Sequence, residues 1–166
     1  MITSRSAFLS SVRNFIFGAE DSLVSTVGLL AGLFAANLQT ADIVLAGLVL
    51  IFVEAFSMAV GSFLSEKSID ESQGQKEENV PLFDGVIMFF SYLLCGFIPL
   101  FPYIVMPKGL AFAVSIAVTL CALFVLGIVS GKILKTSGIR NALRMLIVGG
   151  AAAALGIVVG ILFKVA

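Results

Sequence analysis

Histidine and tryptophan are absent from the 166 residues, and charged residues make up only 12% of the chain. The lack of histidine excludes Ser-His-Asp and Cys-His catalysis, haem ligation through histidine and histidine-based zinc sites. The two cysteines, Cys95 and Cys121, stand alone inside apolar runs, and we interpret them as small hydrophobic residues and not as a disulfide or a metal pair. Lys+Arg and Asp+Glu balance at ten each, so no net positive charge attracts nucleic acid. We therefore expect no enzyme, no cofactor and no nucleic-acid partner.

Apolar residues are abundant instead, at 60% of the chain with a mean hydropathy of +1.14. Soluble domains carry about 25% charged residues, so the composition indicates an integral membrane protein in contact with a lipid bilayer. A membrane-crossing helix needs about 20 apolar residues. The sequence predicts an all-α protein with a single transmembrane domain over residues 1–166 and five transmembrane helices, at about 15–36, 42–64, 82–105, 110–131 and 142–163.

Lysine and arginine are unevenly distributed among the segments that join these helices. If the N-terminus is inside, eight of them lie on the inner side, and Lys108 and Lys164 lie outside. The positive-inside rule then places the N-terminus in the cytoplasm and the C-terminus outside. Residues 1–14 hold no apolar core of a cleavable signal. We expect a prokaryotic cell (plasma) membrane, with a vacuolar or other organellar membrane as the alternative.

The polar segment 65–80 is then cytoplasmic, and it carries five acidic residues against two lysines. We interpret it as a solvated connector, with a metal-gathering site as the alternative.

Carboxylates inside the apolar runs are the most informative residues. Glu54 interrupts the second run, and Asp21, with Glu20 beside it, lies in the first. A charged residue at the centre of a membrane helix costs about 2.5–3.5 kcal/mol on insertion scales. A buried carboxylate without a basic partner is protonated, holds a cation or faces water, and each outcome is typical of a transporter. A neutral Glu54 hydrogen-bonded to another helix is the alternative.

Methionine accompanies two of the carboxylates at helical spacing. Met58 lies four residues after Glu54, on the same helical face, with Ser57 beside it. A carboxylate oxygen and a thioether sulfur together suit a transition metal better than Mg²⁺ or Ca²⁺. Met88 follows Asp84 at the same spacing, although Asp84 opens the third helix, where a negative charge is favourable by itself. Ordinary packing is the alternative explanation for both methionines.

Glycine pairs at G-x-x-x-G spacing occur in three helices: "GLLAG" (28–32), "GIVSG" (127–131) and "GIVVG" (156–160). Small residues allow transmembrane backbones to approach closely. The pattern predicts tight helix contacts but does not identify which helices meet.

Four stretches resemble the vacuolar iron transporter family. "FGAEDSLVSTVGLLAGL" (17–33) and "AGLVLIFVEAFSMAVGSFLS" (46–65) resemble that family's first two helices. "CGFIPLFPYIV" (95–105) is similar to the end of its third helix, and "RNALRMLIVGGAAAALGIVVG" (140–160) to its last. The resemblance covers all five predicted helices in order.

The resemblance implies a homodimer that moves Fe²⁺, and often Mn²⁺, out of the cytosol in exchange for protons. The ion path then runs between the protomers, and the residues at the family's positions are Asp21, Glu54 and Met58. Glu20, Ser57, Asp84 and Met88 are accessory candidates. Fe²⁺ or Mn²⁺ is the transported substrate and H⁺ the coupling ion, so no cofactor is implied.

The chain also departs from the family pattern. Typical members carry a long, metal-collecting cytoplasmic insertion between helices two and three, where this chain has about sixteen polar residues. Ser62 and Phe63 replace a glutamate and a tyrosine, and Ser22 replaces a glycine. We therefore expect a short-loop member that lacks the cytoplasmic metal-binding domain. The alternatives are a proton-coupled carrier or channel for another small solute, and a non-transporting membrane assembly protein.

Overall fold

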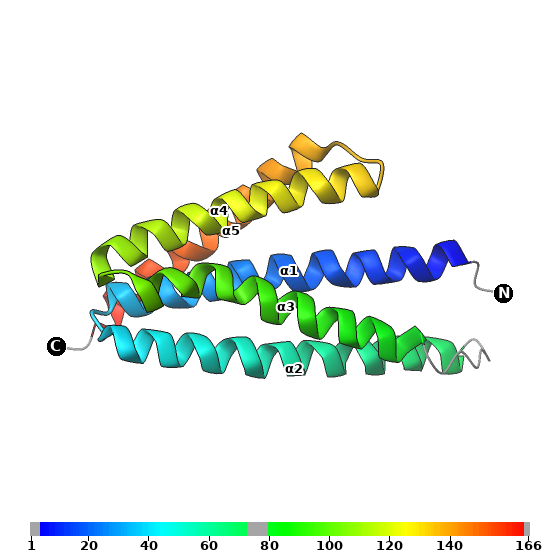
Figure 1. Ribbon diagram of the computed structural model, residues 1–166, viewed down its shortest axis with the longest axis horizontal. Coiled ribbons are helices and arrows are strands. Elements are labelled where there is room, and N and C mark those ends of the chain that lie inside the picture. The colour runs from blue at the N-terminus through cyan, green and yellow to red at the C-terminus, as the bar shows by residue number, and fades with distance from the viewer. Residues whose placement is uncertain (1–3, 73–79, 165–166) are drawn as a thin grey trace.

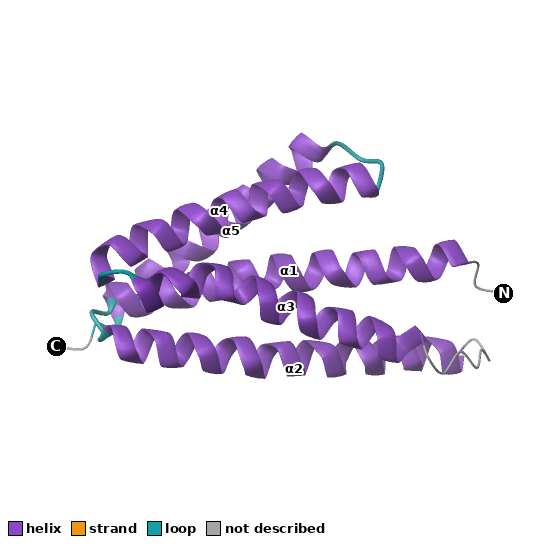
Figure 2. Cartoon of the chain, in the orientation of Figure 1, coloured by secondary structure: helices purple, strands orange, loops and turns teal. Residues whose placement is uncertain are grey.

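Helices make up almost all of the described part of the chain. The computed structural model describes residues 4–72 and 80–164, and these residues form five helices with no strand between them (Figures 1 and 2). The helices are α1 (Ser4–Ala35), α2 (Thr40–Ser72), α3 (Val80–Val105), α4 (Lys108–Ile133) and α5 (Gly138–Leu162). Each contains a stretch long and apolar enough to cross a membrane. The predicted fold class, with its five transmembrane helices, is confirmed.

Two predicted helix boundaries are wrong. α1 begins at Ser4 and not near residue 15, and α2 continues to Ser72 instead of ending near residue 64. Hydropathy detects the part of a helix that lies in lipid, whereas polar residues extend a helix in water when no Pro or Gly interrupts it. The first half of the predicted connector 65–80 is therefore helix, and residues 73–79 lie outside the described residues.

α1 and α2 are longer than a bilayer requires. They contain 32 and 33 residues, which at about 1.5 Å per residue gives about 48 and 50 Å, against a hydrocarbon core of about 30 Å. The first turns of α1 and the α4–α5 turn lie at one end of the bundle, here called the N-terminal end, together with the last turns of α2 (Figure 1). The α1–α2 and α3–α4 turns lie at the opposite end, here called the C-terminal end.

α1 and α2 touch each other much less than either touches α3. α3 packs along both of them, and α5 packs along α1. The α4–α5 hairpin lies close to α1 at the C-terminal end and diverges from it toward the N-terminal end (Figure 1). α2 therefore packs mainly on α3.

Glycines set the α1–α5 contact. A Cβ on Gly156 or Gly160 would overlap the backbone oxygens of Gly28 and Gly32. The G-x-x-x-G pairs at 28–32 and 156–160 therefore pack on each other, which confirms the predicted tight contacts and identifies the partner helices. The third pair, at 127–131, packs on the first turns of α5.

Candidate functional site

Asp21 and Glu54 lie at the same level of the bundle. A short turn at 36–39 joins α1 to α2, and each carboxylate is 14 residues from the helix end at that turn, Ala35 or Thr40. At about 1.5 Å per residue both lie about 21 Å from the turn, inside a hydrocarbon core of about 30 Å. The two carboxylates are close enough for their charges to repel each other. Glu20 adds a third charge that interacts with Asp21.

No basic side chain neutralises this pair. Among the side chains that the structure describes, the salt bridge that forms is Arg13–Glu66, and neither Asp21 nor Glu54 has a hydrogen-bond or ion-pair partner there. Both side chains are partly buried. Two interacting carboxylates without a cation favour the uptake of a proton or of a positive ion.

α3 supplies a buried phenol beside the two carboxylates, which the sequence did not suggest. Tyr92 has no exposed surface, and its Oη lies 2.8 Å from Ser25 Oγ of α1. Ser22 Oγ donates to the Tyr92 backbone oxygen at 2.6 Å. The phenol interacts electrostatically with both Asp21 and Glu54. Tyr92 thus holds α1 against α3 at the level of the acidic pair.

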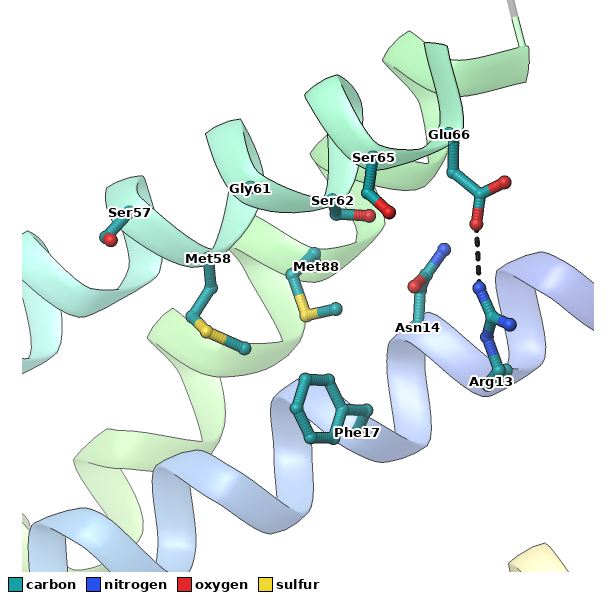
Figure 3. A pocket seen from close by; sticks show the side chains of 10 residues that line it. All are labelled: Arg13, Asn14, Phe17, Ser57, Met58, Gly61, Ser62, Ser65, Glu66 and Met88. Atoms are coloured by element: carbon teal, nitrogen blue, oxygen red, sulfur yellow. Dashed lines mark hydrogen bonds and ion pairs between the residues drawn. The ribbon is translucent and has the colours of Figure 1, made fainter. Parts of the chain in front are cut away.

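A cavity of about 590 Å³ lies among α1, α2 and α3 (Figure 3). Its lining residues on α1 precede Asp21 and those on α2 follow Glu54, so it lies on the N-terminal side of the acidic pair. Met58 lines it one helical turn from Glu54, together with Ser57, and Met88 enters it from α3. Three predicted residues therefore meet in one space. The other lining residues are Arg13, Asn14, Phe17, Gly61, Ser62, Ser65 and Glu66.

Asp84 has a different environment. It is fully buried in the second turn of α3 and accepts hydrogen bonds from Ser10 Oγ (2.6 Å) and Ser11 Oγ (2.7 Å) of α1. It does not line the cavity. Its carboxylate ties α1 to α3.

A single protomer supplies few charged ligands. The described residues contain no cluster of three or more His, Cys, Asp or Glu side chains able to hold a metal ion. A cation at the acidic pair would need further ligands, from Met58, from water or from a second copy of the chain.

Comparison with known proteins places these features in a family. The model of the VIT family matches residues 12–79 and 69–161. Vacuolar iron transporter 1 of Arabidopsis thaliana is 25% identical over 205 positions, which cover 86% of this chain and 82% of that protein. Vacuolar iron transporter homolog 5 of rice (Oryza sativa subsp. japonica) is 28% identical, with 92% and 80% covered. An uncharacterised protein of Methanocaldococcus jannaschii is 26% identical, with 82% and 81% covered.

The matches also locate the departure from the family pattern. The two matched ranges overlap at residues 69–79, which comprise the last turn of α2 and the residues before α3. The Arabidopsis alignment runs over 205 positions, more than the 166 residues of this chain, so that protein carries segments that are missing here. Both findings agree with the expected short connection between the second and third helices.

Proposed function

The chain belongs to the VIT family, and from that premise we propose that it is a proton-coupled transporter that exports Fe²⁺, Mn²⁺ or both from the cytosol by metal/H⁺ antiport. The observation that carries the proposal is the pair of partly buried carboxylates, Asp21 and Glu54, at one level of α1 and α2 without a basic partner among the described residues. The relatives named vacuolar iron transporters support the choice of substrate. The membrane we propose is a prokaryotic cell membrane.

The direction of transport follows from the distribution of charge. Arg13 of α1, Lys67 in the last turns of α2, and the lysines and arginines flanking the α4–α5 turn belong to the N-terminal end of the bundle. The positive-inside rule makes this end cytoplasmic. The cavity that leads to the acidic pair then opens on the cytoplasmic side, from which the ion enters.

Proton coupling follows from the competition of metal and proton for the same oxygens. A carboxylate binds metal only when it is deprotonated. On the acidic side, protons displace the ion from Asp21 and Glu54 and release it there. The protonated, uncharged pair then returns through the low-dielectric interior at lower cost than a charged pair.

Dimerisation completes the ion site. Glu54 and Met58 of α2 are only partly buried within the protomer. A two-fold axis along α1 and α2 brings together two copies of Asp21, Glu54 and Met58, so that four carboxylates and two thioethers surround one path. A protein mass in detergent equal to one protomer, by light scattering, would contradict the shared path.

Transport in proteoliposomes tests the function. In inverted vesicles, whose cytoplasmic face is outside, an acidic lumen is expected to drive Fe²⁺ or Mn²⁺ into the vesicle while protons leave the lumen. Glu54→Gln removes one carboxylate charge with little change of shape and is expected to abolish metal uptake. Glu71→Gln, on an exposed position of the same helix, is the matched control. Full transport by Glu54→Gln would show that this pair is not the ion site.

A further inference from the structure

Besides Met58, the cavity among α1, α2 and α3 contains ligand atoms that the acidic pair does not use. We propose that it is an entry site, which holds a divalent transition-metal ion before the ion reaches Asp21 and Glu54. The ligands come from Asn14, Met58, Ser62 and Met88, and from Glu66 once it leaves Arg13. This inference rests on the proposed function, since it concerns the route of the same ion.

Two buried polar groups in the cavity lack partners. Asn14 is only 5% exposed, and its Nδ2 has no hydrogen-bond partner in the described part of the chain. The same holds for Ser62 Oγ. Figure 3 shows the Asn14 amide projecting from α1 toward the serines of α2. An unpartnered buried polar atom is unfavourable. A hydrated cation bound by Ser62 Oγ, with a water molecule that accepts a hydrogen bond from Asn14 Nδ2, would satisfy both atoms.

Two thioethers meet in the same space. The side chains of Met58 and Met88 both extend into the cavity from different helices (Figure 3). Met88 is 3% exposed, and a Cβ on Gly18 would come within 2.9 Å of its Sδ. Glycine at this position of α1 therefore leaves room for the sulfur. Sulfur ligands give a transition metal an advantage over Mg²⁺ and Ca²⁺.

The guanidinium group of Arg13 lies beside Glu66, in the place that a bound metal ion would take. We call this part of the cavity, lined by Arg13 and Glu66, the cavity mouth. Arg13 Nη2 lies 2.7 Å from Glu66 Oε1. The Arg13 side chain is 69% exposed and that of Glu66 19%, and an ion pair this accessible to water adds little stability. A divalent ion that enters the cavity can therefore take the place of the guanidinium on Glu66 while Arg13 turns into solvent.

The set of ligands fits a site through which a metal ion passes, and not a site that retains the ion. It has one carboxylate among neutral oxygen and sulfur atoms, and the described residues contain no cluster of three His, Cys, Asp or Glu side chains. Met58 lies one turn from Glu54 on α2. An ion held in the cavity is thus one helical turn from the acidic pair.

Metal binding in a chain without the acidic pair tests the entry site. The full-length protein in detergent, with Asp21→Asn and Glu54→Gln, is titrated with Co²⁺ by calorimetry and by visible absorption. We expect about one ion per protomer. Loss of a residue that only hydrogen-bonds a metal ligand already lowers metal affinity about 10–100-fold. Glu66→Gln and Met88→Leu, which remove ligands themselves, are each expected to raise the Kd for Co²⁺ by at least about tenfold. Arg13→Gln is expected to lower it, because Glu66 is then free.

Matched controls exclude general effects of charge. Glu71→Gln and Arg140→Gln change exposed residues outside the cavity and are expected to leave Co²⁺ binding unchanged. Size-exclusion profiles and circular dichroism check that each variant is folded. If Met88→Leu does not fold, Ser62→Ala replaces it as the second cavity variant. The absence of Co²⁺ binding in the double variant, or equal affinity in all cavity variants, would overturn the entry site. Transport by the otherwise unchanged Glu54→Gln protein tests the proposed function separately.

Discussion

Asp21 and Glu54 lie at the same level of two antiparallel helices, each 14 residues from the turn that joins them, and their charges repel each other. In a membrane such an arrangement is unfavourable when both groups are charged and no cation is present. The unfavourable pair is an expected property of a site that must bind an ion and then release it.

The repulsion predicts the effect of neutralising one member. Asp21→Asn is expected to raise the apparent Tm of the metal-free protein by about 2–4 °C, the shift that about 1 kcal/mol causes in a chain of this size. The same change is expected to abolish metal uptake. Thermal unfolding at pH 7.5 with a metal chelator measures the first effect, and Glu71→Gln is the control. A lower Tm would mean that Asp21 has a stabilising partner.

Metal affinity is expected to fall as the pH falls. A carboxylate binds the ion only when it is deprotonated, so protons and the ion compete for the same oxygens and metal binding weakens as the pH is lowered. The slope of log Kd against pH is expected to be shallower in Glu54→Gln, which has one fewer carboxylate for protons and the ion to compete for. Mn²⁺ titrations between pH 5.5 and 8 measure both slopes, and identical slopes would contradict competition at Glu54.

Tyr92→Phe is expected to impair transport without loss of the fold. The change removes the hydrogen bond between Oη and Ser25 Oγ, which is worth about 0.5–1.5 kcal/mol, and keeps the ring in place. We expect a lower uptake rate with unchanged preference between Fe²⁺ and Mn²⁺. Tyr103→Phe is the matched control, because Tyr103 is equally buried and its Oη has no partner in the described residues. Equal rates in both variants would show that Tyr92 does not position the pair.

Gly156→Val is expected to prevent close packing of α1 and α5. The new side chain would overlap the backbone at Gly28, and overpacking of this kind costs about 1–3 kcal/mol or more. The Tm in detergent and the yield of folded protein are expected to fall. Gly150→Ala, at a position where a Cβ meets nothing within 4 Å, is expected to have little effect. A normal Tm in Gly156→Val would indicate that the helices separate without cost.

Hydropathy and spacing predicted the membrane-crossing parts of the helices and the residues that could bind an ion. They did not predict that α1 begins at Ser4 or that α2 reaches Ser72, because a polar helix in water has no hydropathy signal. Tyr92 was missed because its partner Ser25 is 67 residues away. The cavity was missed for the same reason: Asn14 and Glu66 are unremarkable until α1 and α2 are placed side by side.

Because α1 and α2 are longer than the hydrocarbon core is thick, the cavity mouth lies at the level of the lipid headgroups. Arg13 and Glu66 are 22 and 26 residues from the α1–α2 turn, or about 33 and 39 Å, so they reach the lipid headgroups beyond a core of about 30 Å. An anionic cytoplasmic leaflet has a surface potential of about −30 mV, which by itself concentrates a divalent cation about tenfold. The membrane surface can therefore supply part of the metal accumulation that a cytoplasmic metal-binding domain would otherwise provide.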